Sequence, residues 1–329
     1  MRFLRATTVL VLLASMASSA AHAGVVECAS RRATLVGTPG DDVLVGTPGR
    51  DVIVGRGGND RIIGRGGNDF LCGESGSDVI RGDNGRDSLF AGSGADRLRG
   101  GKGPDDLWGE TGNDLHAGGK GSDWFGDNRG SINVVDLRAG TATGVGNDTL
   151  RSIENAHVFG TSGATLRGAS GPNQLAILDG NGALTGRGGD DALSISGHEF
   201  DLTGGPGDDV MQVITLSGTA TYDGGSGIDK LRFLGFGPVT VDLRDPGHTS
   251  IEWLLGTNRG DTLTGDDSAN VILGRGGSDS ISGEGGDDRL DGGRGSNSID
   301  GGEGVDHCVK PTPAEGAINC EPPNPTGYR

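Results

Sequence analysis

The chain has 329 residues, of which 67 are glycine, and its formal net charge is −17. Glycine is therefore roughly three times as frequent as in ordinary proteins, whereas aromatic residues make up only 4 %. This composition excludes a large, closely packed globular core. The acidic charge disfavours nucleic acids and anionic membrane surfaces as partners. Two fold classes remain, a disordered chain and a glycine-based repeat fold.

Residues 1–23 have the features of a secretory signal peptide. A basic start (residues 1–5) precedes an apolar stretch (residues 6–20), and Ala21-His22-Ala23 offers small residues at the cleavage positions. No mature segment is apolar over the about 18 residues that a membrane span needs. We therefore expect a secreted, extracellular protein without a membrane span, whose N-terminal cap covers residues 24–36.

The four cysteines fit an extracellular location, because disulfides persist in oxidising compartments. Cys28 and Cys72 lie near the start of the patterned region, and Cys308 and Cys320 lie at its end. Four cysteines allow three pairings, and we favour Cys28–Cys72 and Cys308–Cys320, which would staple both ends. Their spacing does not match a zinc site.

Ten nine-residue units follow one another without a gap over residues 37–126. In each unit the fourth residue is glycine, the sixth is aspartate, and the eighth is apolar except at His116. Low-complexity disorder does not hold three positions in phase over this length, so we predict a repeat fold. The sixth-position residues are Asp42, Asp51, Asp60, Asp69, Asp78, Asp87, Asp96, Asp105, Asp114 and Asp123.

Residues 127–255 are less regular but contain a duplication. Val135-Asp136-Leu137-Arg138 recurs as Val241-Asp242-Leu243-Arg244, and Ser152-Ile153-Glu154 recurs as Ser250-Ile251-Glu252. We expect an irregular β-solenoid of longer coils without a full metal column. Isolated units here supply Asp191, Asp209 and Asp229 at the sixth position.

A second block of six units covers residues 256–309, followed by a tail (residues 310–329) that we expect a disulfide to cap. Its sixth-position residues are Asp261, Asn270, Asp279, Asp288, Asn297 and Asp306. The two asparagines should weaken their sites, because they carry no charge.

The nine-residue spacing has a physical reading. Glycines allow tight turns, and the polar–apolar–polar end of each unit makes a short strand with one inward side chain. Two units then close one coil of eighteen residues, so the sixth-position aspartates form two columns. Neighbouring aspartates within a column lie about 4.8 Å apart, which is the strand spacing. Such carboxylates repel one another unless a cation lies between them, and carboxylate with carbonyl oxygens suits calcium better than magnesium or zinc.

The units resemble the glycine-rich nonapeptide of the RTX, or hemolysin-type calcium-binding, proteins; Gly118-Gly119-Lys120-Gly121-Ser122-Asp123-Trp124-Phe125 follows that pattern well. The two blocks cover a little under half of the chain. The resemblance implies an all-β fold, a right-handed parallel β-roll or β-helix solenoid, with multiple Ca²⁺ ions held between coils by the sixth-position aspartates and turn carbonyls. The N-terminal signal peptide and the cysteine staples depart from the family pattern.

We therefore expect a secreted calcium-binding repeat protein that folds on binding Ca²⁺ and has a structural, adhesive or matrix role, with cell-surface or matrix glycans or proteins as partners. The alternative is a polysaccharide lyase or epimerase whose site lies in residues 127–255, with Glu154 or Glu252 paired with an aspartate. No metal-protease histidine spacing or nucleophile elbow is present, so we expect no enzyme. Trp108, Trp124 and Trp253 either stack on sugars or are surface aromatics.

Overall fold

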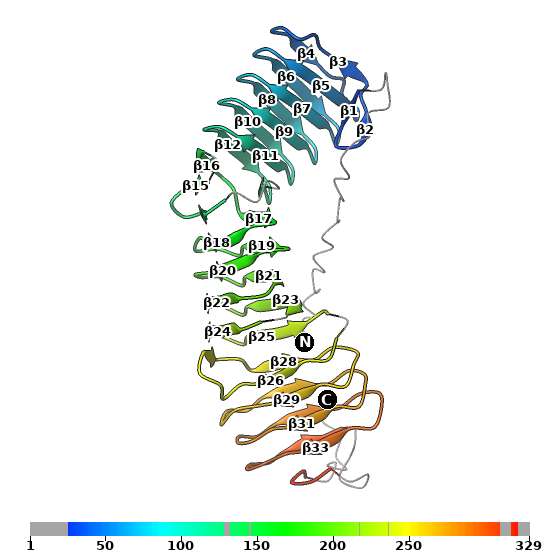
Figure 1. Ribbon diagram of the computed structural model, residues 1–329, viewed down its shortest axis with the longest axis vertical. Helices are drawn as coiled ribbons and strands as arrows, with labels where there is room; N and C mark the ends of the chain where they lie inside the picture. Colours follow the sequence, from blue (N-terminus) through cyan, green and yellow to red (C-terminus); the bar gives the residue numbers. More distant parts are fainter. Residues whose placement is uncertain are drawn as a thin grey trace.

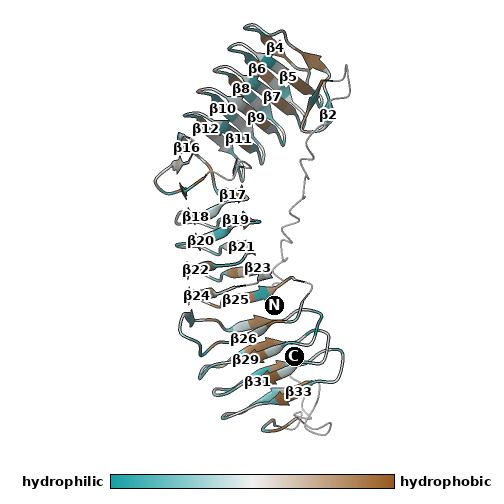
Figure 2. Ribbon diagram, viewed as in Figure 1, coloured by the Kyte–Doolittle hydropathy of each residue, from teal (hydrophilic) through white to brown (hydrophobic). Residues whose placement is uncertain are grey.

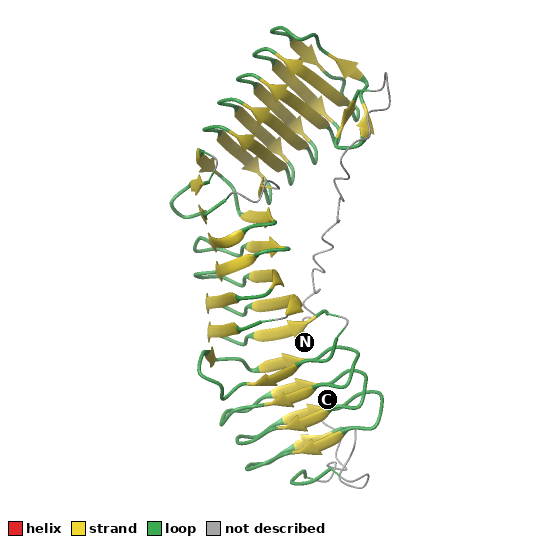
Figure 3. Ribbon diagram, viewed as in Figure 1, coloured by secondary structure: helices red, strands yellow, loops and turns green. Residues whose placement is uncertain are grey.

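The computed structural model describes residues 26–127, 132–144, 146–216, 218–235, 237–309 and 317–321. Over these residues it consists of strands and loops without a helix (Figure 3), and the strands stack along the axis of an elongated molecule (Figure 1). The predicted all-β, parallel solenoid is confirmed. None of the described segments forms a helix long and apolar enough to cross a membrane. The predicted signal peptide lies outside the described residues.

Two long sheets run side by side along the solenoid, and over residues 35–127 and 155–233 successive strands alternate between them. The first sheet has fifteen parallel strands. In spatial order they are β3 (Leu35–Val36), β5 (Val52–Gly57), β7 (Phe70–Ser75), β9 (Ser88–Ser93), β11 (Asp106–Thr111), β13 (Trp124–Asp127), β17 (Asn155–Phe159), β19 (Gln174–Leu178), β21 (Ala192–Gly197), β23 (Val210–Leu216), β25 (Lys230–Phe233), β28 (Trp253–Leu255), β30 (Val271–Leu273), β32 (Arg289–Asp291) and β34 (His307–Cys308).

The second sheet has thirteen strands and is followed by a separate sheet of four. The thirteen are β4 (Val43–Val45), β6 (Arg61–Gly66), β8 (Val79–Asn84), β10 (Arg97–Lys102), β12 (Leu115–Lys120), β16 (Asn147–Arg151), β15 (Thr141–Thr143), β14 (Val134–Asp136), β18 (Ser162–Arg167), β20 (Asn181–Thr185), β22 (Phe200–Pro206), β24 (Ala220–Ser226) and β27 (His248–Thr249). The four are β26 (Thr240–Asp242), β29 (Thr262–Thr264), β31 (Ser280–Ser282) and β33 (Ser298–Asp300).

The register follows the eighteen-residue coil in both repeat blocks. Leu71 pairs with Ile53 on one side and with Leu89 on the other, and all three side chains are fully buried. Apolar residues lie on the strands, and many connecting turns are hydrophilic (Figure 2). One eighth-position side chain per unit therefore forms the core of these blocks, as the period predicts.

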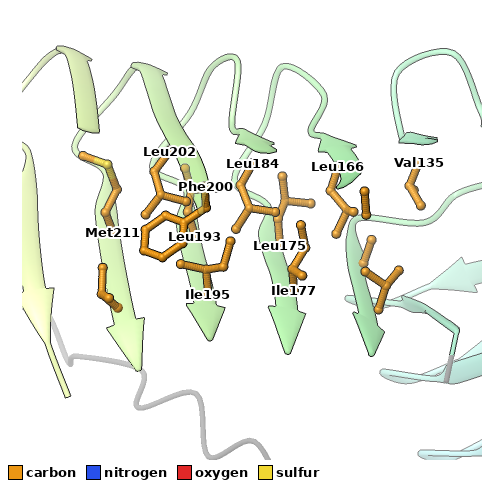
Figure 4. Packing of buried hydrophobic residues seen from close by; sticks show 14 of the residues in the cluster. Val135, Leu166, Leu175, Ile177, Leu184, Leu193, Ile195, Phe200, Leu202 and Met211 are labelled. Carbon is orange, nitrogen blue, oxygen red and sulfur yellow. The ribbon is translucent and has the colours of Figure 1, made fainter. Parts of the chain in front are cut away.

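The core of the middle region is wider than in the repeat blocks. Here a strand of the first sheet turns two apolar side chains inward, for example Leu175 and Ile177, which are both fully buried. Figure 4 shows this pair on β19 with Leu184 and Leu166 of the second sheet close by. The core of one residue per unit that the sequence predicts for the nonapeptide blocks therefore does not extend to the longer coils expected here, because both Leu175 and Ile177 lie on the inner face of β19.

The duplicated Val-Asp-Leu motifs mark two interruptions of the second sheet. The first lies at β14, where the antiparallel strand β15 is inserted between β14 and β16. The second lies at β26, which starts the four-stranded sheet after β27 ends the longer one. At the first interruption both terminal nitrogens of Arg187 bond to Asp136, at 2.7 and 2.8 Å. At the second, Arg244 pairs with Asp242 at 2.8 Å.

A disulfide bond fastens the polypeptide at each end of the solenoid. The antiparallel hairpin of β1 (Glu27–Cys28) and β2 (Arg31–Arg32) is fastened to β7 by the Cys28–Cys72 bond. Cys308 is bonded to Cys320 near the C-terminal end. No cysteine in the described part of the chain is free. This is the pairing favoured from the positions of the four residues.

Candidate metal centre

The sixth-position aspartates form ladders in which each carboxylate holds the backbone of the preceding coil. Each aspartate lies in the turn just before a strand, and the eighteen-residue register places it beside the aspartate one coil earlier. The N–H of Asp51 donates to Asp69 Oδ1 at 2.8 Å, and the N–H of Asp69 donates to Asp87 Oδ1 at 2.9 Å. One oxygen of each carboxylate therefore has a structural partner within the protein.

The described residues contain five such ladders. The first block holds two of them, Asp42-Asp60-Asp78-Asp96-Asp114 and Asp51-Asp69-Asp87-Asp105-Asp123. The middle region holds Asn173-Asp191-Asp209-Asp229. The second block holds Asp261-Asp279-Asn297 and Asn270-Asp288-Asp306. The middle region thus has a ladder that contains its three predicted ligands, Asp191, Asp209 and Asp229, although no full metal column was expected there.

The second oxygen of most column carboxylates is buried without any hydrogen-bond partner. This holds for fourteen of the seventeen aspartates that the sequence singled out. A buried acceptor without a partner costs about 1–3 kcal/mol, and a buried charge costs more. The fourteen are Asp60, Asp69, Asp78, Asp87, Asp96, Asp105, Asp114, Asp123, Asp191, Asp209, Asp229, Asp279, Asp288 and Asp306.

Glycine starts the unit of all but one of these aspartates and lets the Oδ2 atom approach the backbone closely; Asp96 lies in the unit that starts with Ala91. A Cβ placed on Gly64 would lie 2.3 Å from Asp69 Oδ2 and 3.0 Å from the carbonyl oxygen of Gly82, so the two oxygens converge beside this glycine. A Cβ on Gly55 would likewise lie 2.2 Å from Asp60 Oδ2 and 3.0 Å from a carbonyl oxygen. Carboxylate and carbonyl oxygens are the donors that calcium prefers, so these residues fit a calcium ion.

Three predicted ligands differ, because threonine occupies the second position of their units. Asp42 Oδ2 accepts hydrogen bonds from the N–H of Thr38 at 2.5 Å and from its hydroxyl at 2.9 Å. Asp51 is bonded in the same way by Thr47. Asp261 Oδ2 accepts the N–H of Thr257 at 2.7 Å. Each of these carboxylates begins a ladder, and its second oxygen already has partners within its own turn.

Three acidic residues continue the ladders beyond the repeats. The N–H of Asp123 donates to Glu154 Oε2 at 2.9 Å, and the N–H of Asp229 donates to Glu252 Oε2 at 2.7 Å. The N–H of Asp114 donates to Asp148 Oδ1 at 2.9 Å. The duplicated Ser-Ile-Glu motif drew attention to the two glutamates in the sequence, but it did not indicate that they accept a backbone N–H at the end of a ladder. No sequence motif marks Asp148.

Burial makes the columns electrostatically unfavourable in the absence of a cation. Desolvation raises the pKa of Asp105 to about 7, opposed by the hydrogen bond from the N–H of Asp87 and increased by the charge of that residue and of Asp123. Desolvation likewise raises the pKa of Asp288 to about 7 and that of Asp69 to about 6. A cation beside these carboxylates would offset their mutual repulsion and would give each partnerless oxygen an interaction partner.

Of the other residues singled out from the sequence, the three tryptophans pack against other side chains, and the two glutamates end ladders. Trp108 and Trp124 each pack against the ring of His157, with centroid distances of 4.7 and 5.1 Å. Trp253 lies beside the ammonium of Lys230 at 5.3 Å. Glu154 and Glu252 end two different ladders, so the structure gives both a role in the backbone ladder rather than in a paired acid–base site.

The repeat blocks match a known family of sequences. Residues 36–71, 73–107, 90–125, 255–290 and 282–309 match the RTX calcium-binding nonapeptide repeat (4 copies). These segments coincide with the two ungapped blocks, which contain four of the five ladders. These segments of the chain are therefore similar to the RTX calcium-binding nonapeptide repeat, as the resemblance implied. A search of curated proteins found none that matches the chain.

Proposed function

We propose that this chain is an extracellular calcium-binding solenoid in which ion binding and folding are coupled, and that the folded rod has a structural, adhesive or matrix-contacting role. The observation that carries the proposal is the set of buried Oδ2 atoms without partners along the columns. Most of them lie in a turn whose first glycine lets the carboxylate oxygen come close to a carbonyl oxygen of the next coil.

The coupling of folding to calcium follows from the cost of the columns. Without calcium, the carboxylates repel one another and lack partners, and the core of the repeat blocks is only one side chain per unit wide. With calcium, the binding free energy adds to the free energy of folding. Sites of extracellular modules bind calcium at about 10⁻⁴–10⁻³ M, so the protein would be folded where calcium is in the millimolar range.

Three features support the extracellular, structural part of the proposal. The two disulfides fit an oxidising compartment, and the signal peptide predicted for residues 1–23 would direct the chain there. The fifteen-stranded sheet gives a rod about 70 Å long at the usual strand spacing. Such a solenoid offers a long surface to a glycan or protein of the matrix, which we propose as the partner.

Far-ultraviolet circular dichroism of the mature protein tests the calcium part of the proposal. We expect a gain of β signal on adding millimolar calcium, loss of this signal with chelator, and no equal effect of magnesium, which prefers water and strict octahedral sites. A triple variant, Asp69→Asn, Asp87→Asn and Asp105→Asn, should need more calcium. Exposed Asp41→Asn is the matched control. Identical β spectra in calcium and in chelator would contradict the proposal.

Binding to immobilised matrix glycans and matrix proteins tests the adhesive role separately. We expect retention in millimolar calcium and release by chelator, because only the folded rod presents a continuous surface. Absence of retention by either class of partner in calcium would exclude adhesion while leaving the calcium-coupled fold intact.

A further inference from the structure

The first block departs from its pattern at one inward position, His116. In the register of the second sheet this residue lies between Leu98 and Leu150, where an apolar side chain is expected. The side chain is fully buried, and neither ring nitrogen has a hydrogen-bond partner. The apolar column therefore contains a polar ring whose donors and acceptors are unused, which is costly.

Two carboxylates face this ring. One ligand atom each of Asp114, His116 and Asp148 can be chosen so that all three lie within 4.8 Å of one another. A Cβ placed on Gly109 would lie 2.4 Å from Asp114 Oδ2 and 2.7 Å from His116 Nε2, so both atoms converge beside this glycine. Asp114 Oδ2 is also buried without a partner.

The comparison with an ordinary unit shows what the histidine changes. In the unit that starts at Gly256, the space beside the glycine is bordered by Asp261 Oδ2 at 2.4 Å, a carbonyl oxygen at 3.2 Å and Leu263 Cδ1 at 3.2 Å. His116 occupies the position of that leucine and supplies a nitrogen instead of a methyl group. On another side, the ring of Phe125 contacts the imidazole edge-on, with centroids 5.1 Å apart.

We propose that Asp114, His116 and Asp148 together bind one divalent transition-metal ion of the zinc class, at the point where the first column leaves the repeat block. One imidazole nitrogen and two carboxylate oxygens suit Zn²⁺ or Co²⁺, whereas calcium takes oxygen ligands. Ligand atoms of a tetrahedral zinc ion are about 3.3 Å apart at bond lengths of about 2.0 Å. The three side chains therefore need to close by no more than about 1.5 Å, and a fourth position is left for water.

This site uses Asp114, the last repeat aspartate of its ladder, for a transition-metal ion in place of calcium, and it leaves the other column carboxylates to calcium. The other ladders contain oxygen ligands only, so we expect one transition-metal ion per chain. No free cysteine in the described residues competes for the ion, and the site is distinguished from the calcium columns by its nitrogen ligand.

The test uses tag-free mature protein with its disulfides intact, in buffer containing 5 mM calcium. After incubation with Zn²⁺ and gel filtration, we expect one equivalent of zinc to remain by elemental analysis. Co²⁺ in its place should give visible absorption of a nitrogen–oxygen site. His116→Leu restores the apolar residue of the other units, so it should fold and keep its calcium content while losing the zinc and the cobalt spectrum.

Two further variants make the outcome decisive. Asp148→Asn keeps the Oδ1 acceptor for the N–H of Asp114 but removes the charge, and it should weaken Co²⁺ binding at least tenfold. His307→Leu, at an exposed position, should leave binding unchanged. The proposal is overturned if the unmodified chain retains no zinc, if 5 mM calcium displaces the zinc, or if His116→Leu retains as much zinc as the unmodified chain.

Discussion

Replacing Asp87 by asparagine separates the two roles of its carboxylate. Asp87 is fully buried; its Oδ1 accepts the N–H of Asp69 at 2.9 Å, and its Oδ2 has no partner. Asparagine keeps an oxygen for the hydrogen bond but removes the charge that would hold calcium. Alanine removes both, and it leaves the N–H of Asp69 buried and unsatisfied.

The two substitutions should differ in how the free energy of unfolding depends on calcium. Above its dissociation constant, each bound ion adds about 1.4 kcal/mol of stability for every tenfold rise in calcium. Asp87→Asn should lower this slope by the contribution of at least one ion. Asp87→Ala should lower the slope equally and also cost a further 1–3 kcal/mol, roughly, at every calcium concentration, because a buried N–H loses its acceptor.

Urea unfolding in 1, 3 and 10 mM calcium, followed by circular dichroism, measures both quantities. Asp267→Asn is the matched control, because this aspartate is exposed and lies outside the columns; its slope should equal that of the unmodified protein. An unchanged slope for Asp87→Asn would refute the assignment of Asp87 as a calcium ligand. Equal stability of the asparagine and alanine variants would refute the role of the Oδ1 hydrogen bond.

Three further predictions concern pH, the turns and the N-terminal disulfide. Burial raises the pKa of Asp105 well above the ordinary value of an aspartate, to about 7, so the calcium-free folded state should gain stability as the pH falls from 7.5 to 5, and lose it again as the pH rises through about 7. Thermal melts in calcium should show the opposite trend, because protons compete with the ion; the same trend in both buffers would contradict the prediction. Gly67→Ala should prevent or severely weaken folding in calcium, since Gly67 has φ +110° and a Cβ there would lie 2.5 Å from the carbonyl carbon of Gly49; a melting temperature within 2 °C or so of the unmodified protein would contradict this. Replacing Cys28 and Cys72 by serine should lower the free energy of unfolding by about 2–4 kcal/mol, and no change in urea midpoint would show that the bond does not restrict the unfolded chain.

The sequence alone is sufficient for the parts of the fold that repeat. A period of nine, with glycine, aspartate and an apolar residue held in phase, predicts the parallel solenoid, the eighteen-residue register and the two aspartate columns of the first block. These features follow from local turn chemistry and from the strand spacing, so no long-range information is needed. The boundaries drawn at residues 37, 126, 256 and 309 remain predictions.

The parts that could not be predicted depend on contacts between segments of different spacing. Glu154 reaches Asp123 across 31 residues, and Asp148 reaches Asp114 across 34, because the insertion around β15 changes the coil length. The threonine caps had a visible signal, since threonine stands at the second position of only three units, at Thr38, Thr47 and Thr257. Their effect on the carboxylate became clear only from the geometry of the turn.

A crystal structure of the mature protein grown in calcium, with the ions located by anomalous scattering, tests the central claim most directly. The account predicts ions beside the partnerless Oδ2 atoms of the columns, for example at Asp69 and Asp87, and none held by Oδ2 of Asp42 or Asp51, where threonine already donates. Columns without ions, or ions bound equally at the threonine-capped carboxylates, would contradict it.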